Sequence, residues 1–350
     1  MLARGVRKEL PRKSGMSDAG SVAHVAGPTR KVPIDVMRAV SMLYIVGFWH
    51  LLDYTKVVAW HYNPVTYRLT VVALSLFVLI SGFLTGRKDG GLARGEIWNF
   101  YKTRFWRIYL PFVIASGLFL AAGVSDALAL FKGVTLVAML LAPPPYTLWF
   151  VNMIVLFYLI APLLIGLRGN EVGYIGLCTV IVGAMILYQA VTGRIDVRLI
   201  LYFPCFAAGI FMAGGSLPSS TPSLIGLTLL AALALVLTLE RPSWGLEGDL
   251  WAMPWALFGS IAVFAVVMRA GRNLEAPPIL TQFSDASFFM YLLHRPLYLW
   301  MQTVWFPSTE KEQVPYLLFV CLPIVGFVAW LCQRAYTGFL QRRAVLVAAP

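Results

Sequence analysis

The sequence has few charged residues for its length. Only 13% of its 350 residues are charged, whereas a soluble domain carries about 25%. So few charges cannot cover a water-exposed surface, and 59% of the residues are hydrophobic. The bulk of the chain is therefore neither a soluble domain, nor a disordered segment, nor a nucleic-acid-binding arm.

Cysteine is also scarce, and the motifs of several enzyme classes are missing. The four cysteines lie inside apolar stretches without any Cys-x-x-Cys pair, so we expect neither a disulfide framework nor a metal site. The sequence has no phosphate-binding glycine loop, no dinucleotide fingerprint, no His-Glu-x-x-His helix and no nucleophile elbow. These absences disfavour ATP-driven transport by this chain alone, zinc proteolysis and serine hydrolysis.

Long apolar runs make up most of the chain. A membrane-spanning helix needs about 20 mostly apolar residues, and the runs are too uniformly apolar for outer-membrane strands, which alternate in polarity. The sequence therefore predicts an all-α polytopic membrane protein with about ten transmembrane helices. The expected spans are 33–52, 69–86, 108–124, 148–167, 172–191, 199–215, 222–239, 250–268, 283–303 and 315–333.

The polar ends and one short apolar segment complete the expected organisation. We expect a flexible, basic cytoplasmic tail over 1–31, a transmembrane domain over 32–335 and a cytoplasmic C-terminal tail over 336–350. Residues 127–142 are apolar but short, and Lys132 interrupts them, which favours a re-entrant or interfacial helix over an eleventh span. With the N-terminus inside, most Lys and Arg residues fall on the inner side, as membrane topology requires. The net charge of +12 then belongs to membrane-flanking loops rather than to a nucleic-acid interface.

The first span carries four ionisable residues. Such groups cost at least a few kcal/mol each in the bilayer and are functional candidates by default. Asp35 and Arg38 share a helical face and are expected to form a structural ion pair. His50 lies about 22 Å further along the helix, and Asp53 follows it. A carboxylate near an imidazole can orient it and raise its basicity, as a general base needs, while solvation of both groups by lipid headgroups is the alternative.

Two further clusters of polar residues stand out. Lys102, Arg104 and Arg107 lie among aromatic residues before the third span, where they could grip a phosphate group or simply anchor the membrane interface. In the ninth span, His294 and Arg295 follow Tyr291 on a segment otherwise suited to lipid. We expect this adjacent pair to face the bundle or a watery cavity, either as a functional site or as a hydrogen-bonded knot between helices.

Five sequence motifs, in order, carry a resemblance to a known family. They are PIDVMRAV…FWH, LFVLISGFLTG, TRFWRIYLP, TLWFVNMIVLFYLIAPLL and ASFFMYLLHRPLYL. Together with ten spans and a basic N-terminus, they make the chain resemble the membrane-bound acyltransferase 3 family over roughly 33–333. Members of that family are bacterial enzymes that O-acylate sugars and related acceptors.

The resemblance implies roles for particular residues. Arg38 and His50 match the family's Arg and invariant His in span one, although eleven residues separate them here where the family has ten. One extra residue turns a straight helix by about 100°, so either a local bulge absorbs it or the role of Arg38 differs. Arg104 and Arg107 match the family's R-x-x-R element.

The resemblance also implies an acetyl-CoA-dependent O-acetyltransferase without a permanently bound cofactor. The acyl-CoA phosphates would meet Arg104, Arg107 and Lys102. His50 would act either as a general base or as a covalent acyl carrier, in a catalytic group with Asp53, Asp35 and Arg38. The expected pocket and oxyanion residues are Asn152, Trp149, Tyr291 and His294.

The expected acceptor is a hydroxyl of a cell-surface or lipid-linked saccharide. The resemblance implies a place in the bacterial inner membrane, with the N-terminus in the cytoplasm and a glycan-synthesis complex as one setting. A secondary transporter or flippase for a lipid-linked glycan is the alternative, because ten helices with buried His, Arg and Asp fit that class as well. The sequence shows none of the internal repeats that transporters often have.

Overall fold

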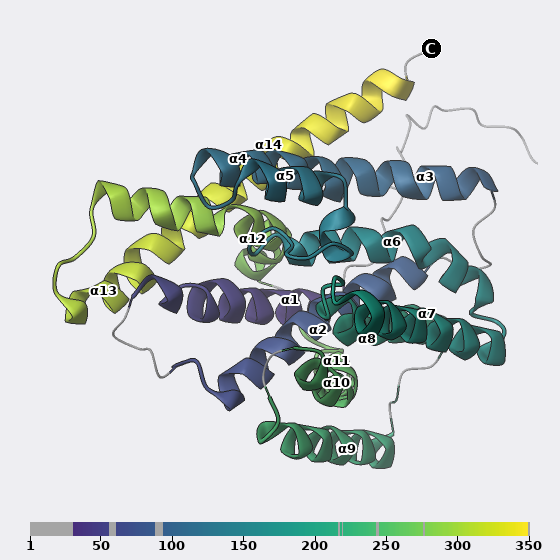
Figure 1. Ribbon diagram of the computed structural model, residues 1–350. Helices are drawn as coiled ribbons and strands as arrows, with labels where there is room; N and C mark the ends of the chain where they lie inside the picture. Colours follow the sequence, from purple (N-terminus) through teal and green to yellow (C-terminus); the bar gives the residue numbers. More distant parts are fainter. Residues whose placement is uncertain are drawn as a thin grey trace, which may run out of the picture. The chain divides into compact units, whose positions relative to one another are not determined.

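The computed structural model describes residues 31–55, 61–87, 94–215, 218, 220–242, 245–275 and 277–348. The chain from Val32 onward forms one compact unit, to which everything below refers, and its described part contains helices and no strands (Figure 1). Residues 1–30 of the expected N-terminal tail lie outside the described residues.

The described helices follow one another closely along the chain. The α-helices are α1 (Val32–Tyr44), α2 (Pro64–Gly86), α3 (Arg94–Arg104), α4 (Leu110–Ala121), α5 (Ala127–Val134), α6 (Trp149–Leu167), α7 (Glu171–Thr192), α8 (Arg198–Gly214), α9 (Thr221–Leu239), α10 (Gly245–Pro254), α11 (Ser260–Ala270), α12 (Pro278–Val304), α13 (Glu310–Tyr316) and α14 (Leu322–Ala348). Single π-helical turns are η1 (Ile45–Trp49), η4 (Phe105–Tyr109), η6 (Trp255–Gly259) and η7 (Leu317–Cys321), and 3₁₀ turns include η2 (Leu52–Tyr54) and η5 (Val137–Met139).

Each of the ten predicted spans lies on these helices. Within the described residues, eight helical stretches are long and apolar enough to cross a membrane. The two predicted spans outside this set are α8, which has 17 residues, and α12, which carries Asp285, His294 and Arg295. The all-α polytopic membrane fold is therefore confirmed, whereas the count of ten spans is not.

The ambiguous segment 127–142 does not form a spanning helix. Its helix α5 has eight residues, or about 12 Å, and a hydrocarbon core is about 30 Å thick. The chain then turns through η5, where Leu136 has a φ of 63°. The segment is consequently a short helix followed by a turn, as expected for a re-entrant or interfacial element.

Helices α2 and α8 pack in direct backbone contact. A Cβ atom on Gly82 would lie 2.2 Å from the Phe206 carbonyl oxygen, and one on Gly209 would lie 2.2 Å from the Leu79 carbonyl oxygen. Glycine is required at both positions because any side chain would collide with backbone. Further along, a Cβ atom on Gly86 would lie 2.7 Å from the Ile210 carbonyl oxygen, so the contact moves from Phe206 to Ile210 as α2 advances from Gly82 to Gly86. Helices α2 and α8 therefore run parallel.

Helices α1 and α12 also run parallel. The Ser284 hydroxyl donates to Asp35 Oδ1 at 2.7 Å, and Arg38 Nη2 donates to the Ser287 hydroxyl at 3.1 Å. In a ten-span topology the second and sixth spans share one direction, and so do the first and ninth. An additional span at 127–142 would break both relationships, so the packing agrees with the short α5.

The core lies among α1, α2, α6, α8 and α12, while other helices face outward. In the most apolar 18-residue stretch of α7 no residue is buried, and in the corresponding stretch of α9 22% of the residues are buried. Figure 1 shows α9 at the edge of the bundle, beyond α10 and α11. These exposed apolar surfaces suit contact with lipid.

The segment expected as a C-terminal tail continues α14 up to Ala348. The Tyr336 hydroxyl donates to the Trp106 carbonyl, and the Arg343 guanidinium lies 3.5 Å from the centre of the Trp106 ring. The end of α14 is thereby attached to η4, next to the R-x-x-R element.

Candidate active site

A π-helical turn positions His50 at the end of the first span. The His50 backbone N–H donates to the Ile45 carbonyl at 2.9 Å, which is the i to i−5 spacing of η1. Such a turn takes up one residue more than an α-turn. A local bulge, one of the two alternatives that the spacing of Arg38 and His50 left open, is thus present. The Tyr298 hydroxyl fastens it to α12 by donating to the Val46 carbonyl at 3.1 Å.

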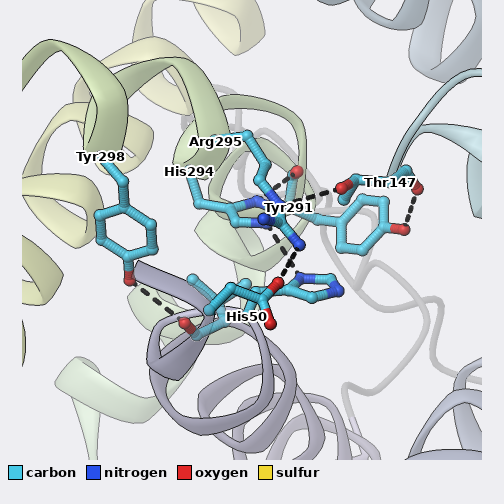
Figure 2. A network of polar contacts seen from close by, with 8 residues as sticks. His50, Thr147, Tyr291, His294, Arg295 and Tyr298 are labelled. Atoms are coloured by element: carbon cyan, nitrogen blue, oxygen red, sulfur yellow. Dashed lines mark hydrogen bonds and ion pairs between the residues drawn. The ribbon is translucent and has the colours of Figure 1, made fainter. Parts of the chain in front are cut away.

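The His50 ring is hydrogen-bonded to a second imidazole (Figure 2). His50 Nδ1 lies 3.0 Å from His294 Nε2, and His294 Nδ1 lies 2.8 Å from the Tyr291 carbonyl oxygen. His294 is fully buried. The three groups form a chain that starts at the backbone of α12 and ends at His50.

This chain of hydrogen bonds determines which nitrogen of His50 carries a proton. A carbonyl oxygen only accepts, so His294 Nδ1 must donate. With both rings neutral, His294 Nε2 is then an acceptor and His50 Nδ1 is the donor to it. The remaining nitrogen, His50 Nε2, carries an unshared lone pair, and no acceptor or donor among the described residues engages it.

Arg295 is fixed next to the two imidazoles by two hydrogen bonds. Its Nη2 donates to Asp53 Oδ2 at 2.6 Å, and its Nε donates to the Thr147 hydroxyl at 3.0 Å. These bonds use two of its five N–H groups. The expectation that Asp53 orients His50 is corrected here, because Asp53 binds Arg295 and His294 is the partner of His50. Both partners are neighbouring residues of α12.

Thr147 connects this cluster to the loop before α6. Its φ is 61°, a left-handed conformation that is rare for a β-branched residue. In this position its carbonyl accepts from the Tyr291 hydroxyl while its own hydroxyl binds Arg295. Strained backbone of this kind persists where the surroundings over-determine it, which is typical of functional sites.

A cavity of about 430 Å³ opens beside these residues. His50, Asp53, Tyr291 and Arg295 line one part of it, and the loop 143–147 contributes several further residues. Aromatic rings and two guanidinium groups dominate the walls. The volume fits a small organic group, and convergent polar groups in a largely apolar pocket are typical of a binding or active site.

Asp35 and Arg38 are buried or half-buried away from this cavity. Neither of them lines it, and their contacts include hydrogen bonds to Ser284 and Ser287 of α12. They fasten α1 to α12 below the imidazole pair. Their contribution to the site is therefore to hold the two helices in register, and a direct catalytic role stays a prediction.

The expected pocket residues on α6 separate into two groups. Trp149 lines the cavity. Asn152 does not, because its Nδ2 donates to the Gly133 carbonyl at 2.6 Å and ties α6 to α5. Asn152 is thus removed from the expected oxyanion group, while Tyr291 remains in the cavity wall.

The two arginines of the R-x-x-R element differ in their surroundings. The Arg104 guanidinium lies 4.6 Å from the Phe100 ring centre and 4.9 Å from that of Tyr158, and its Nη2 donates to the Thr85 hydroxyl at 3.2 Å. Arg107 and Lys102 are exposed. The π-turn η4 begins directly after Arg104, and it changes the angle between the two arginines that an α-helix would give.

Two charged residues of the cavity wall were missing from the expected site. Arg295 was noticed as part of the polar cluster in span nine, yet nothing in the sequence connects it to Asp53, 242 positions earlier. Arg198 precedes the sixth span and reads as an ordinary loop charge.

Among the described residues, no group of three or more His, Cys, Asp or Glu could hold a metal ion.

One family model matches most of the chain. The acyltransferase-domain model of the acyltransferase 3 family matches residues 32–333, a range that contains every residue of the cluster around His50. No curated protein and no solved structure gave a match. The chain belongs to the acyltransferase 3 family and is a multi-pass membrane acyltransferase.

Proposed function

We propose that this protein transfers an acyl group, in the simplest case acetyl, from acyl-CoA to a hydroxyl of a saccharide acceptor. The observation that carries the proposal is the lone pair on His50 Nε2, which the chain through His294 and Tyr291 leaves available at a cavity wall. An acyl transfer to an alcohol needs such a base, because a hydroxyl is a weak nucleophile until its proton is removed.

The transfer can be written with the proton accounted for. His50 Nε2 takes the proton of the acceptor hydroxyl while that oxygen attacks the thioester carbonyl carbon. The tetrahedral intermediate then collapses, the carbon–sulfur bond breaks, and the CoA sulfur receives the proton from His50 Nε2. The products are the O-acyl ester and free CoA, and His50 returns to its starting tautomer.

Arg295 is suited to stabilise the intermediate. Its fork is held by Asp53 and Thr147, it lines the same cavity as His50, and it has N–H groups beyond the two that these bonds use. Donors fixed in advance near a developing oxyanion are typically worth about 10²–10³ in kcat. Tyr291 is already engaged with the Thr147 carbonyl, so it positions this part of the wall.

Acyl-CoA is the proposed donor, bound as a co-substrate with no permanent cofactor. Arg104, Arg107 and Lys102 are the proposed contacts of its phosphates. Arg104 Nε is buried and has no partner among the described residues, so the guanidinium retains a donor for a ligand. Its stacking on Phe100 and Tyr158 keeps the group in place without neutralising its charge.

The proposed location is the bacterial inner membrane, with the N-terminus in the cytoplasm. The excess of Lys and Arg on one side of the expected topology supports this orientation. It gives the basic residues of α3 access to cytosolic acyl-CoA and brings the acceptor, a cell-surface or lipid-linked saccharide, to the opposite side. A glycan-synthesis complex is the proposed setting.

The lone pair on His50 serves equally well for a covalent acyl carrier. The two roles differ in what accumulates without an acceptor. Incubation of the purified protein with radiolabelled acetyl-CoA alone gives a labelled protein if His50 carries the acyl group, and the label is absent in His50→Ala. If no label accumulates while transfer to an added acceptor proceeds, His50 acts as a base.

The function is tested on the glycans of the cell surface. Mass spectrometry of these glycans, with and without the gene, should show the loss of an acyl group in the deletion and its return on complementation with the wild-type gene. Identical acyl patterns in the two strains would contradict the proposed acceptor class.

A further inference from the structure

Arg198 occupies a part of the cavity wall that the proposed mechanism does not use. It is the first residue of α8, and Trp149, Tyr202 and Tyr67 line the cavity together with it. Its side chain is 32% exposed although it lies within the bundle. A charged group that opens on an internal cavity is a candidate ligand contact.

The Arg198 guanidinium is held on one edge and on one face. Nε donates to Asp196 Oδ1 at 2.8 Å and Nη2 donates to Asp196 Oδ2 at 2.5 Å. Its central carbon lies over the Trp149 ring, 4.0 Å from the ring centre. This leaves three of its five N–H groups, including both on Nη1, without an acceptor among the described residues.

Its support is itself fixed. The Asp196 backbone N–H donates to the Met139 carbonyl at 2.8 Å, and the Ala142 N–H donates to the Arg194 carbonyl at 2.8 Å. These bonds attach the loop before α8 to the chain that leads into the cavity wall at 143–147. The guanidinium is therefore pre-organised, and binding to it does not require the ordering of a free side chain.

The open part of the fork determines the chemistry it recognises. A planar guanidinium with adjacent free N–H groups matches the two oxygens of a carboxylate or phosphate. The charged groups that line the cavity are Arg198, Arg295 and Asp53. Asp53 balances Arg295 and Asp196 balances Arg198, so recognition at Arg198 depends on its free N–H groups and not on an excess of charge. The neighbouring rings of Trp149 and Tyr202 offer flat apolar surface to the ring of a bound organic group.

We propose that Arg198 and Trp149 form an acceptor subsite that binds an anionic group, a carboxylate or a phosphate, on the saccharide. The inference rests on the proposed saccharide acceptor and adds that this acceptor is acidic. The acidic group binds at Arg198 while the hydroxyl to be acylated lies toward His50 in the same cavity. Arg198 thus selects the acceptor, and it takes no part in the proton transfer.

The test is a binding titration with the purified protein in detergent and without acyl-CoA. The probes are methyl β-glucuronide and glucose 1-phosphate, which carry the anion as a carboxylate or a phosphate, and methyl β-glucoside, which has none. At least one anionic probe should bind the wild type about tenfold more tightly than the glucoside, since hydrogen bonds to charged groups are worth about 1.5–3 kcal/mol. The stronger of the two anionic probes identifies the source of the charge.

Three variants, one of them a control, test whether the preference depends on Arg198. Arg198→Gln should bind all three probes alike, whereas Arg194→Gln, which removes an exposed charge from the same loop, should keep the wild-type preference. Arg198→Lys retains the charge without the fork and should show a reduced preference, which protects the test if the Gln variant does not fold. Equal binding of charged and neutral probes by the wild type, an unchanged preference in Arg198→Gln, or its loss in Arg194→Gln would each overturn the inference.

Because this titration measures binding alone, it is independent of the acyl-transfer step. A protein that binds the acidic probes through Arg198 but transfers no acyl group would refute the proposed function and leave the subsite standing. A protein that transfers acyl groups without any preference for acidic acceptors would support the proposed function and refute the subsite.

Discussion

His50 and His294 are 244 residues apart in the chain, yet their ring nitrogens lie 3.0 Å from each other. The two ring planes are parallel to within 3°. The ring centres lie 4.9 Å apart, and the Tyr291 carbonyl gives the hydrogen bond between the rings a direction. The pair resembles the imidazole–carboxylate pairs of general-base catalysis in its orienting role, with a neutral ring in place of the carboxylate.

Replacing His294 tests this orienting role. His294→Ala should lower kcat by about 10², part of the 10²–10⁴ that a positioned base contributes, because His50 can then rotate or change tautomer. His294→Gln should recover part of the rate, since its side-chain oxygen can still accept from His50 Nδ1. The measurement is the initial rate of CoA release with acceptor present.

The KM for acyl-CoA provides the control for this variant. A positioning residue acts on kcat and leaves this KM nearly unchanged, and the rank order Ala below Gln should hold at each pH. A pure packing role predicts instead that Ala and Gln differ only in thermal stability, with equal kcat for the folded protein.

Arg295 gives the second prediction. Arg295→Gln should reduce kcat by about 10²–10³, the usual cost of losing an oxyanion donor. Arg272→Gln, which removes an exposed charge from the turn after α11, is the matched control and should behave like the wild type. If Arg295→Gln raises KM alone, the guanidinium binds substrate in the ground state and is not the oxyanion donor.

Much of this architecture can be predicted from the sequence, because it follows from local patterns. The apolar runs locate the helices, and the extra residue between Arg38 and His50 indicates the π-turn. The partner of each polar side chain cannot be predicted in this way. The contacts His50–His294 and Asp53–Arg295 depend on how α1 and α12 align, and a neighbouring residue such as Asp53 is the natural but incorrect choice for His50.

The same reasoning explains Asn152 and Arg198. Asn152 is polar and lies at the start of an apolar helix, which favours a pocket role, but the chain of α5 folds back and supplies the Gly133 carbonyl as its partner. Arg198 reads as a membrane-flanking charge. In the folded structure it lines the cavity together with Leu201 and Tyr202 of the same helix, a placement that depends on how α8 packs in the bundle.

The acyl-CoA contacts give the third prediction. Arg104→Ala combined with Arg107→Ala should raise the KM for acyl-CoA at least about tenfold, from the loss of charged hydrogen bonds worth about 1.5–3 kcal/mol, with normal expression. Arg334→Ala on α14 removes a basic residue that stacks on Trp330 and should leave that KM unchanged. Unaltered CoA affinity in the double variant would remove the assigned role.

The fourth prediction concerns the contact between α2 and α8. Gly82→Ala places a methyl group against the Phe206 backbone, so the helices must separate, at a cost of at least about 1–3 kcal/mol. Gly117→Ala on α4, where nothing lies within 4 Å, is the control. Melting temperatures in detergent should fall for the first variant and not for the second, and equal values would contradict the backbone contact.

The most direct test of the account is the acyl-transfer activity of His50→Gln. In liposomes loaded with radiolabelled acetyl-CoA and supplied with cell-envelope saccharide, the wild-type protein should produce labelled ester. The variant, confirmed as folded by its melting temperature, should produce the ester at least about 100-fold more slowly. Transfer at the wild-type rate by folded His50→Gln would contradict the central claim that the lone pair of His50 drives the reaction.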